Sequence, residues 1–508
     1  ANINQESDFL DLLWKRMVDG MIFVVSSGAT EQFKRVQETF LSKINIPYVV
    51  VHTTPLTLSP HNVGIDCIYA GKIATEHLIN HGYSSIGCVN FIPPAGKLFH
   101  TDYLFKGYQK ALQQSGIPFN SELIYPIHGW SLEDGRQLAE KRKNSFWTVE
   151  EPANQLKWTL FETSARLFDA ASKFGFSLKD APSTPDGAVQ CYAKGASGKD
   201  PWFLIDTYHR HLERLYASFE LSLEEDRAIE KVIDASRRSY THAVRLMSEY
   251  FIKTLVEADW HFDDTCLQTE IFANHVRPEI GKYKVAYFLV DSLRFELGME
   301  LMKGLGDDFE TELFPAAAQL PGITPVGMAA LLPGAEKGIG LVEKGKSSFD
   351  VSIGEVILRD RTARIAHLRN KVDHSLIELK LNDLMKPKKK LREEILTAEF
   401  AVVTSQEIDR LGEKSETEEE VRRYIDEVLQ KLRLGIRRLA SLGYQRFFLT
   451  SDHGHLFGQE IDSGLKMDPP GGRKFGLHRR VWIGRGGTVS YTHLRAHETS
   501  LHLVCRLL

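Results

Sequence analysis

Cysteine is scarce in this sequence, which has five cysteines in 508 residues and no CxxC pair. This argues against a disulfide framework or a thiolate zinc site, and scattered thiols fit a reducing compartment such as the cytoplasm. Long apolar runs are also missing, because no stretch approaches the ~18 residues that a membrane-spanning helix needs. We therefore expect a cytoplasmic protein with no membrane partner.

An excess of one charge sign is absent too. Lys and Arg number 63 against 67 Asp and Glu, and this net charge of −4 excludes a polybasic, histone-like protein. The composition that is present, 43% hydrophobic and 26% charged, is typical of a packed globular chain. At about 150 residues per domain, the length suggests about three domains.

Apolar runs alternate with amphipathic stretches over residues 1–140, which favours a parallel, doubly wound α/β sheet. The segments DGMIFVVS, IPYVVVHT, VGIDCIYAGKIATEHLINHGYSSIGCV and FKGYQKALQQSGIPFNSELIY resemble the effector-binding core of LacI/GalR-type regulators. That core has a periplasmic-binding-protein fold, and only the first half of it is represented, so the resemblance implies an incomplete lobe. It also places Asp66 near a small-molecule cleft, whereas the residues alone equally allow a helix N-cap.

Residues 141–280 are expected to be mostly helical. Apolar residues recur at helical spacing in 151–175, 206–220 and 224–258, and we expect a packing or scaffold role for these helices. His209 and His211 stand two residues apart and do not share a helix face, so they do not predict a metal pair.

Acidic and histidine residues follow apolar runs in residues 281–488. VAYFLV (285–290) predicts a buried strand that ends at Asp291, and RFFLTS (446–451) predicts another that ends at Asp452 and His453. Ligands of open α/β sheets bind at the carboxyl ends of strands, where carboxylate and imidazole groups suit a metal ion. Taken alone, Asp291 could equally be a helix N-cap.

Thr324 follows a Pro-Gly turn and precedes Pro325 and a short apolar helix. Thr before Pro is ordinary at a helix start, as N-cap and N1. A hydroxyl nucleophile at the positive end of a helix, where phosphate could bind, has the same pattern.

Further polar residues leave two interpretations open. Asp409 and Glu413 follow an expected strand at 400–404, either as hard oxygen ligands or as a solvated acidic face. His478 precedes another apolar strand, and the adjacent Arg479 and Arg480 could face phosphate or solvent.

The order of FLVDSLRFELG, LPGITPVGMAALLPG, VTSQEIDRLGE and LTSDHGHLF resembles the alkaline phosphatase superfamily and, within it, the PglZ domain of BREX-type phage-defence proteins. The resemblance covers 281–488 and extends to 141–280, because such chains carry an upstream helical region. Position by position, the resemblance implies two metal sites. The first comprises Asp291, Asp452 and His453, with Thr324, rather than Ser292, as the nucleophile or its stand-in; the second comprises Asp409, Glu413 and His478.

The resemblance implies a divalent-metal-dependent phosphoesterase of bacterial phage defence that acts on diesters ahead of monoesters. Two ions are expected, zinc first, with manganese or magnesium as alternatives because Glu413 is a hard ligand. The implied partners are a phosphate-ester substrate, including nucleic acid, and other BREX proteins such as the PglX-type methyltransferase. The alternative function is a small-molecule-binding LacI-type regulator fragment fused to a non-catalytic PglZ scaffold.

Residues 489–508 resemble translated sequencing-adapter read-through, so we expect an artefactual tail rather than an amphipathic helix. The LacI-like and PglZ-like parts have no obvious functional connection, so we expect a chimeric sequence that is joined near residue 140. Because residue 1 is Ala rather than Met, we also expect the natural start to be missing or processed.

Overall fold

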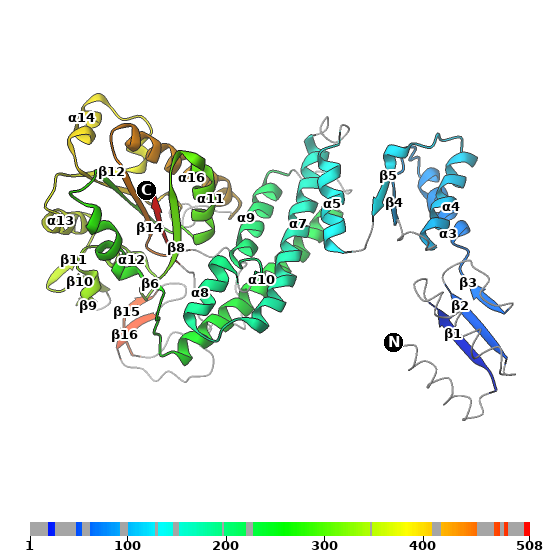
Figure 1. Cartoon of the computed structure of the whole chain (residues 1–508), viewed down its shortest axis with the longest axis horizontal. Helices are drawn as coiled ribbons and strands as arrows, with labels where there is room; N and C mark the ends of the chain where they lie inside the picture. The colour runs from blue at the N-terminus through cyan, green and yellow to red at the C-terminus, as the bar shows by residue number, and fades with distance from the viewer. Residues whose placement is uncertain are drawn as a thin grey trace. The chain divides into compact units, whose positions relative to one another are not determined.

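The computed structural model divides the chain into two units, Ala1–Arg142 and Lys143–Leu508, which are considered separately (Figure 1). The structure describes residues 19–25, 47–52, 61–91, 100–127, 131–145, 152–195, 198–219, 227–345, 348–408, 418–454, 472–477, 482–485 and 502–507. Within these ranges, no helix is both long enough and apolar enough to cross a membrane.

The first unit contains parallel strands and helices, as its strand–helix pattern predicts. One parallel sheet is formed by β1 (Met21–Val25), β2 (Tyr48–His52) and β3 (Asn62–Gly64), and a parallel pair by β4 (Cys88–Phe91) and β5 (Ile124–Ile127). The helices of this part are α3 (Cys67–Asn80), α4 (His100–Gln114) and α5 (Leu132–Lys143). The mixed α/β class expected for this part is confirmed.

The second unit begins with a helical region. It comprises α7 (Pro152–Ser177), α8 (Pro185–Lys194), α9 (Phe203–Ala217) and α10 (Arg227–Glu257). Helices α7, α9 and α10 lie alongside one another (Figure 1), because each presents an apolar stripe to the others. Leu160, Leu167, Leu212 and Ile233 are buried in this packing.

A seven-stranded sheet follows, in the order β12-β13-β7-β14-β17-β8-β6. Its strands are β6 (Cys266–Leu267), β7 (Val285–Val290), β8 (Thr311–Ala317), β12 (Leu376–Lys380), β13 (Phe400–Ser405), β14 (Arg446–Ser451) and β17 (His502–Leu507). Strands β12, β13, β7 and β14 are parallel, whereas the backbone of β17 pairs antiparallel with β14 and β8. β17 lies in the segment that the sequence analysis assigns to read-through.

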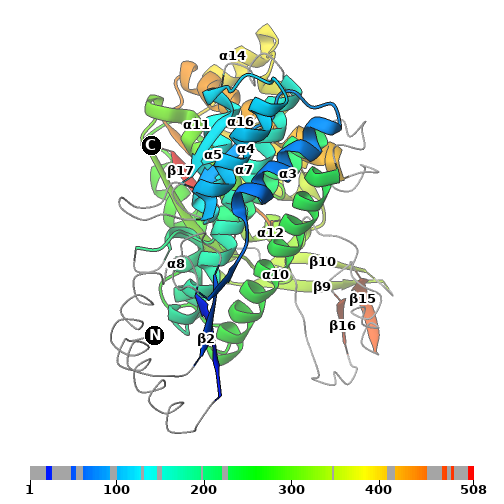
Figure 2. The same cartoon turned by 90° about the vertical axis from the view of Figure 1, so that its right-hand side faces the viewer.

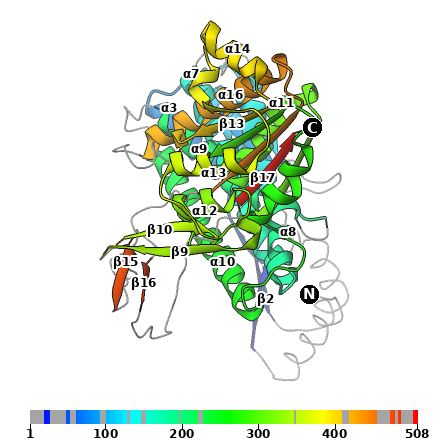
Figure 3. The same cartoon turned by 90° about the vertical axis from the view of Figure 1, so that its left-hand side faces the viewer.

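Helices cover this sheet on both faces (Figure 3). They are α11 (Phe295–Leu305), α12 (Thr324–Ala330), α13 (Arg361–Lys371), α14 (Lys389–Thr397) and α16 (Glu418–Ser441). A second sheet contains β9 (Ile339–Lys344), β10 (Ser348–Ile353) and β11 (Val356–Leu358). A hairpin of β15 (Arg473–Leu477) and β16 (Trp482–Arg485) lies beside β10 (Figure 2).

The strands alternate their side chains between two apolar cores. All six residues of β7 are buried. Ala286, Phe288 and Val290 belong to the core that includes α9, α11 and α16. Val285, Tyr287 and Leu289 belong to the core that includes α12, α13 and β10. Because a strand buried on both faces is apolar throughout, the first polar residue, Asp291, comes at its carboxyl end.

Candidate metal centre

Two aspartates meet at the carboxyl ends of neighbouring parallel strands. The register pairs Val290 of β7 with Ser451 of β14, so that the next residues, Asp291 and Asp452, emerge together. Both side chains are buried, with 1% and 0% of their surface exposed. The sheet register therefore brings together two carboxylates that are far apart in the sequence.

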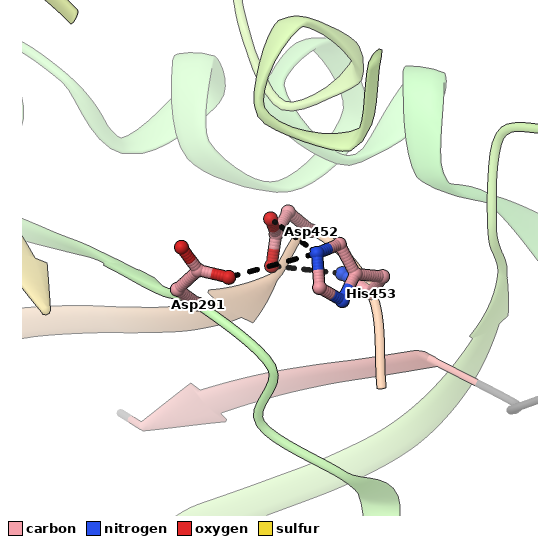
Figure 4. Close-up of side chains that lie close together, drawn as sticks. All are labelled: Asp291, Asp452 and His453. Atoms are coloured by element: carbon pink, nitrogen blue, oxygen red, sulfur yellow. Dashed lines mark hydrogen bonds and ion pairs between the residues drawn. The ribbon is translucent and has the colours of Figure 1, made fainter. Parts of the chain in front are cut away.

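His453 completes a cluster with these aspartates (Figure 4). Asp291, Asp452 and His453 each offer a ligand atom within 4.8 Å of the others. His453 Nε2 lies 3.6 Å from Asp291 Oδ1 and 3.3 Å from Asp452 Oδ2. These are the three residues that the sequence resemblance, together with Thr324, assigns to one metal site.

The ring of His453 is oriented by its other nitrogen. Nδ1 lies 2.9 Å from the carbonyl oxygen of Gly454 and 3.2 Å from Ser292 Oγ. A carbonyl only accepts hydrogen bonds, so we assign the proton to Nδ1 and a lone pair to Nε2. The Thr324 hydroxyl, 2.9 Å from Nε2, can then donate to that lone pair.

Thr324 reaches this position from the first turn of α12. The N-cap is Ile323, so the ordinary interpretation of Thr324 as the N-cap is wrong by one residue. A Cβ added to Gly327 would lie 2.2 Å from the carbonyl oxygen of Asp452, which means that α12 packs directly on the Asp452 backbone. This close approach holds Thr324 beside His453.

The turn after β7 is fixed to the end of β14. Ser292 has a φ of 62°, a left-handed conformation that is uncommon outside glycine. Its backbone N–H donates to Asp452 Oδ1 over 3.1 Å, and Leu293 N–H donates to Ser451 Oγ over 2.9 Å. Such a conformation persists because its surroundings hold it.

A buried glutamine supports the same strand end from the other side. Gln268 Nε2 donates to the carbonyl oxygens of both Ser451 and Asp452, each at 2.8 Å. Its own Oε1 accepts from Gln319 N–H over 2.9 Å. Gln268 thereby fixes the peptide that carries the Asp452 side chain.

Burial dominates the electrostatics of the cluster. It raises the pKa of Asp452 to about 7, against the opposing hydrogen bonds from the Ser292 and His453 backbone N–H groups. Burial also lowers the pKa of Arg364 on α13, while the charges of Asp452 and Asp291 act on it in the opposite direction. Because Asp291 and Asp452 are buried side by side, ionisation of one carboxyl disfavours ionisation of the other.

The residues present fit a divalent cation. Asp452 Oδ2 is buried and accepts no hydrogen bond among the described residues. A cation would neutralise the paired carboxylates, and two carboxylate oxygens with one imidazole nitrogen suit zinc, and also manganese or magnesium.

The remaining predicted site residues are not tested by this geometry. Asp409, Glu413, His478, Arg479 and Arg480 lie outside the described residues, so the second metal site stays a prediction. Asp66 is exposed and accepts a 2.9 Å hydrogen bond from Tyr69 N–H as the N-cap of α3. This is the alternative that the residues left open, and a ligand role for Asp66 stays a prediction.

Comparison with known proteins assigns relatives to both parts of the chain. Residues 271–481 match the model described as the BREX system PglZ alkaline phosphatase-like domain. Residues 271–481 are a PglZ domain. The PglZ domain contains the whole Asp291–Asp452–His453 cluster and Thr324, and its match begins before the predicted bound of 281 and ends before 488.

Individual relatives show the same division. The chain is 22% identical over 390 residues to the alkaline phosphatase-like protein BrxZ of Escherichia coli O9:H4, covering 69% of this chain and 40% of BrxZ. It is 26% identical over 137 residues to the HTH-type transcriptional regulator DegA of Bacillus subtilis, covering 27% of this chain and 39% of DegA. The chain therefore spans about 40% of the length of these curated relatives.

A solved structure is matched as well. The transcription regulator CcpA of Lactococcus lactis is 24% identical, with 28% of this chain and 48% of that chain covered and a TM-score of 0.22.

Several residues around the PglZ centre have structural roles that the sequence does not reveal. Gln268 lies before the predicted strand, in a segment with no motif. Arg364 is one of several arginines in α13, and nothing in the pattern distinguishes it. Ser292 is noticed in the sequence because it directly follows Asp291, but nothing in the pattern predicts its left-handed backbone.

Proposed function

We propose that the PglZ domain is a divalent-metal-dependent phosphoesterase that hydrolyses phosphodiesters ahead of monoesters. The observation that carries this proposal is the hydroxyl of Thr324, 2.9 Å from His453 Nε2 in a cluster with two buried carboxylates. The alkaline phosphatase-like character of the domain supports the same reaction class.

Asp291, Asp452 and His453 would hold one cation. A bound divalent ion supplies Lewis-acid stabilisation of the charge that develops on phosphoryl oxygens. The lone pair of His453 Nε2 serves one partner at a time, so that binding of a cation would displace the hydrogen bond from Thr324.

Thr324 is the proposed nucleophile. Its Oγ1 attacks phosphorus and loses its proton to water, and the ester alcohol leaves with the electrons of the broken P–O bond. The departing alkoxide takes up a proton from water to become the alcohol. For a diester substrate, water then attacks the phosphorus of the threonine phosphodiester, gives up a proton, releases the phosphate monoester and restores the Thr324 hydroxyl. Ser292 Oγ, which lies 3.2 Å from the other ring nitrogen, orients His453 instead.

We also propose the finer assignments of the resemblance. A second ion would be held by Asp409, Glu413 and His478, with zinc first and manganese or magnesium as alternatives. Arg479 and Arg480 would contact phosphate. The match to a BREX system domain and the similarity to BrxZ support membership of a BREX system. The phage-defence role, the PglX-type methyltransferase as a partner and a substrate that includes nucleic acid are proposed from the sequence resemblance alone. The proposed compartment is the cytoplasm, where scattered thiols stay reduced.

The test is hydrolysis of bis(p-nitrophenyl) phosphate with added Zn²⁺, Mn²⁺ or Mg²⁺. Asp291→Ala and Thr324→Ala are each expected to abolish metal-dependent turnover, and metal analysis of the parent chain should find two ions. The matched control is Thr362→Ala, which removes an exposed threonine hydroxyl from the first turn of α13. Full activity in either site variant would contradict the proposed roles.

A second proposal concerns the first unit, which is similar to the transcriptional regulator DegA. Its resemblance to the effector-binding core of LacI/GalR-type regulators motivates a proposal of small-molecule binding. In this case the PglZ domain would be a non-catalytic scaffold. Calorimetric titration with a panel of monosaccharides tests it, with Asp66→Ala as the site variant. Saturable sugar binding together with no bound divalent ion would favour the regulatory function over the phosphoesterase.

A further inference from the structure

The turn that carries Asp291 extends into the helical region through Arg294. The Arg294 side chain is buried, and its Nη2 lies 2.6 Å from Asp206 Oδ1 on α9. Asp206 also accepts 2.8 Å hydrogen bonds from the hydroxyl groups of Tyr192 on α8 and Tyr240 on α10. One buried carboxylate therefore joins three helices to a residue three positions after a proposed metal ligand.

A second buried ion pair of opposite polarity lies beside the first. Arg210 follows Asp206 by four residues, on the same face of α9. Its Nε lies 3.1 Å from both carboxylate oxygens of Glu296, and both side chains are almost fully buried. On α9 the negative Asp206 thus meets the positive Arg294, and the positive Arg210 meets the negative Glu296. If the two segments ran past each other in the opposite direction, residues of like charge would meet.

Aromatic packing lies between these two ion pairs. The Phe295 ring meets the rings of Tyr192 and Phe203 edge to face, with centroids 6.0 Å and 5.7 Å away. Three consecutive residues, 294 to 296, are therefore anchored in the helical region.

We propose that α9 is a positioning element of the metal centre. Asp206 holds Arg294 at the end of the turn 291–294, Arg210 holds Glu296 just after it, and together they set the affinity for a divalent cation. The turn is tied to β14 at Ser292 and Leu293, and to α9 at Arg294. Without the charge of Asp206, the buried Arg294 loses this ion pair, and the turn that carries the left-handed Ser292 is then held by β14 alone. This inference rests on the proposed metal-binding function.

The experiment uses the full chain after treatment with a chelator. Mn²⁺ affinity is measured by calorimetry, and amide hydrogen exchange of residues 291–297 is followed by mass spectrometry in the metal-free protein. Asp206→Asn removes the charge with little change in shape. It keeps one acceptor oxygen, so one of the two tyrosine hydroxyls, which donate to different oxygens of Asp206, retains its partner. We expect Mn²⁺ binding to weaken by about tenfold or more, as for other residues that orient metal ligands. Exchange at 291–297 should accelerate, while exchange at 446–451 stays unchanged.

The matched control is Glu162→Gln, which also neutralises a buried carboxylate. Glu162 is 3% exposed and pairs with Arg166 at 2.7 Å within α7. It should leave both measurements at their parent values. Arg294→Lys keeps a cation beside Asp206, so no buried carboxylate is left without a counter-charge. It should change both measurements in the same direction as Asp206→Asn, so it decides the matter if Asp206→Asn does not fold.

The outcomes separate the two proposals. A parent chain that binds no Mn²⁺ refutes the proposed function, and the exchange measurement then still decides the role of α9. Parent-like affinity and exchange in Asp206→Asn, or equal losses in Asp206→Asn and Glu162→Gln, would overturn the positioning role.

Discussion

Asp452→Asn is expected to stabilise the metal-free protein at alkaline pH. The ordinary pKa of this carboxyl is 3.8, and burial raises it to about 7 in the folded chain. Between these values the folded protein holds a proton that the unfolded chain has lost. The contribution of this bound proton to the free energy of unfolding is fully present below pH ~3.8, and it is lost as the pH rises through about 7. At about 1.4 kcal/mol per pH unit, the loss amounts to ~4 kcal/mol at pH 8.

Asparagine avoids this loss because it stays neutral at every pH. Its Oδ1 can accept the hydrogen bonds that Ser292 and His453 N–H groups donate to Asp452 Oδ1, over 3.1 and 2.8 Å. Relative to the parent chain, the variant should gain up to ~4 kcal/mol at pH 8, and about 3 kcal/mol of that gain should vanish at pH 5. Divalent ions should then stabilise the parent chain at pH 8 by more than they stabilise the variant, which lacks one carboxylate ligand.

The difference in stability between the variant and the parent chain is measured by urea unfolding in the presence of a chelator. Unfolding is monitored by tryptophan fluorescence, to which the buried Trp202 contributes. Asp186→Asn is the control of opposite sign. Burial opposes ionisation of Asp186, but hydrogen bonds from Thr265 and from the Asp263 and Asp264 N–H groups hold its pKa below the ordinary value. Its stabilising effect is present above pH ~3.8 and is lost on acidification, so Asp186→Asn should destabilise at pH 8. A less stable Asp452→Asn at pH 8 would refute the reasoning.

Two further predictions concern backbone geometry at the same centre. Because Ser292 has a φ of 62°, Ser292→Gly should be more stable than Ser292→Ala by about 1 kcal/mol, measured by urea unfolding; equal stabilities would argue against strain. Gly327→Ala places a methyl group 2.2 Å from the Asp452 carbonyl oxygen and should lower both the thermal midpoint and the Mn²⁺ affinity. Gly175→Ala, in an open position of α7, should be neutral or stabilising, and a harmless Gly327→Ala would contradict the close packing of α12.

The meeting of Asp291, Asp452 and His453 could be anticipated because apolar runs define where strands end, and parallel strands share a carboxyl edge. The neighbours of each strand could not be read from the sequence, since β7 pairs with β13 and β14 across long stretches of chain. The N-cap of α12 was misplaced by one residue because Thr and Pro are favourable at adjacent positions of a helix start.

The support of the centre was harder to foresee. Asp206 and Arg294 belong to segments that the sequence analysis assigns to different regions, and nothing in either local pattern points to the other. Likewise, the amide of Gln268 acts on the peptides of Ser451 and Asp452, a contact created by tertiary packing alone. The helical region was expected to be scaffold, and its contacts with the turn after β7 motivate a more specific proposal.

Because β7 is buried on both faces, its coding sequence tolerates substitutions better than insertions or deletions. Each of its six residues faces one of two different cores, in strict alternation. Loss of a single codon within the strand would exchange the two sets of side chains and rotate Asp291 to the opposite face of the sheet. Substitutions in β7 act on one core at a time, whereas an in-frame deletion would damage both cores and the metal centre at once. Length differences among relatives that keep this centre should therefore fall in the connections between strands.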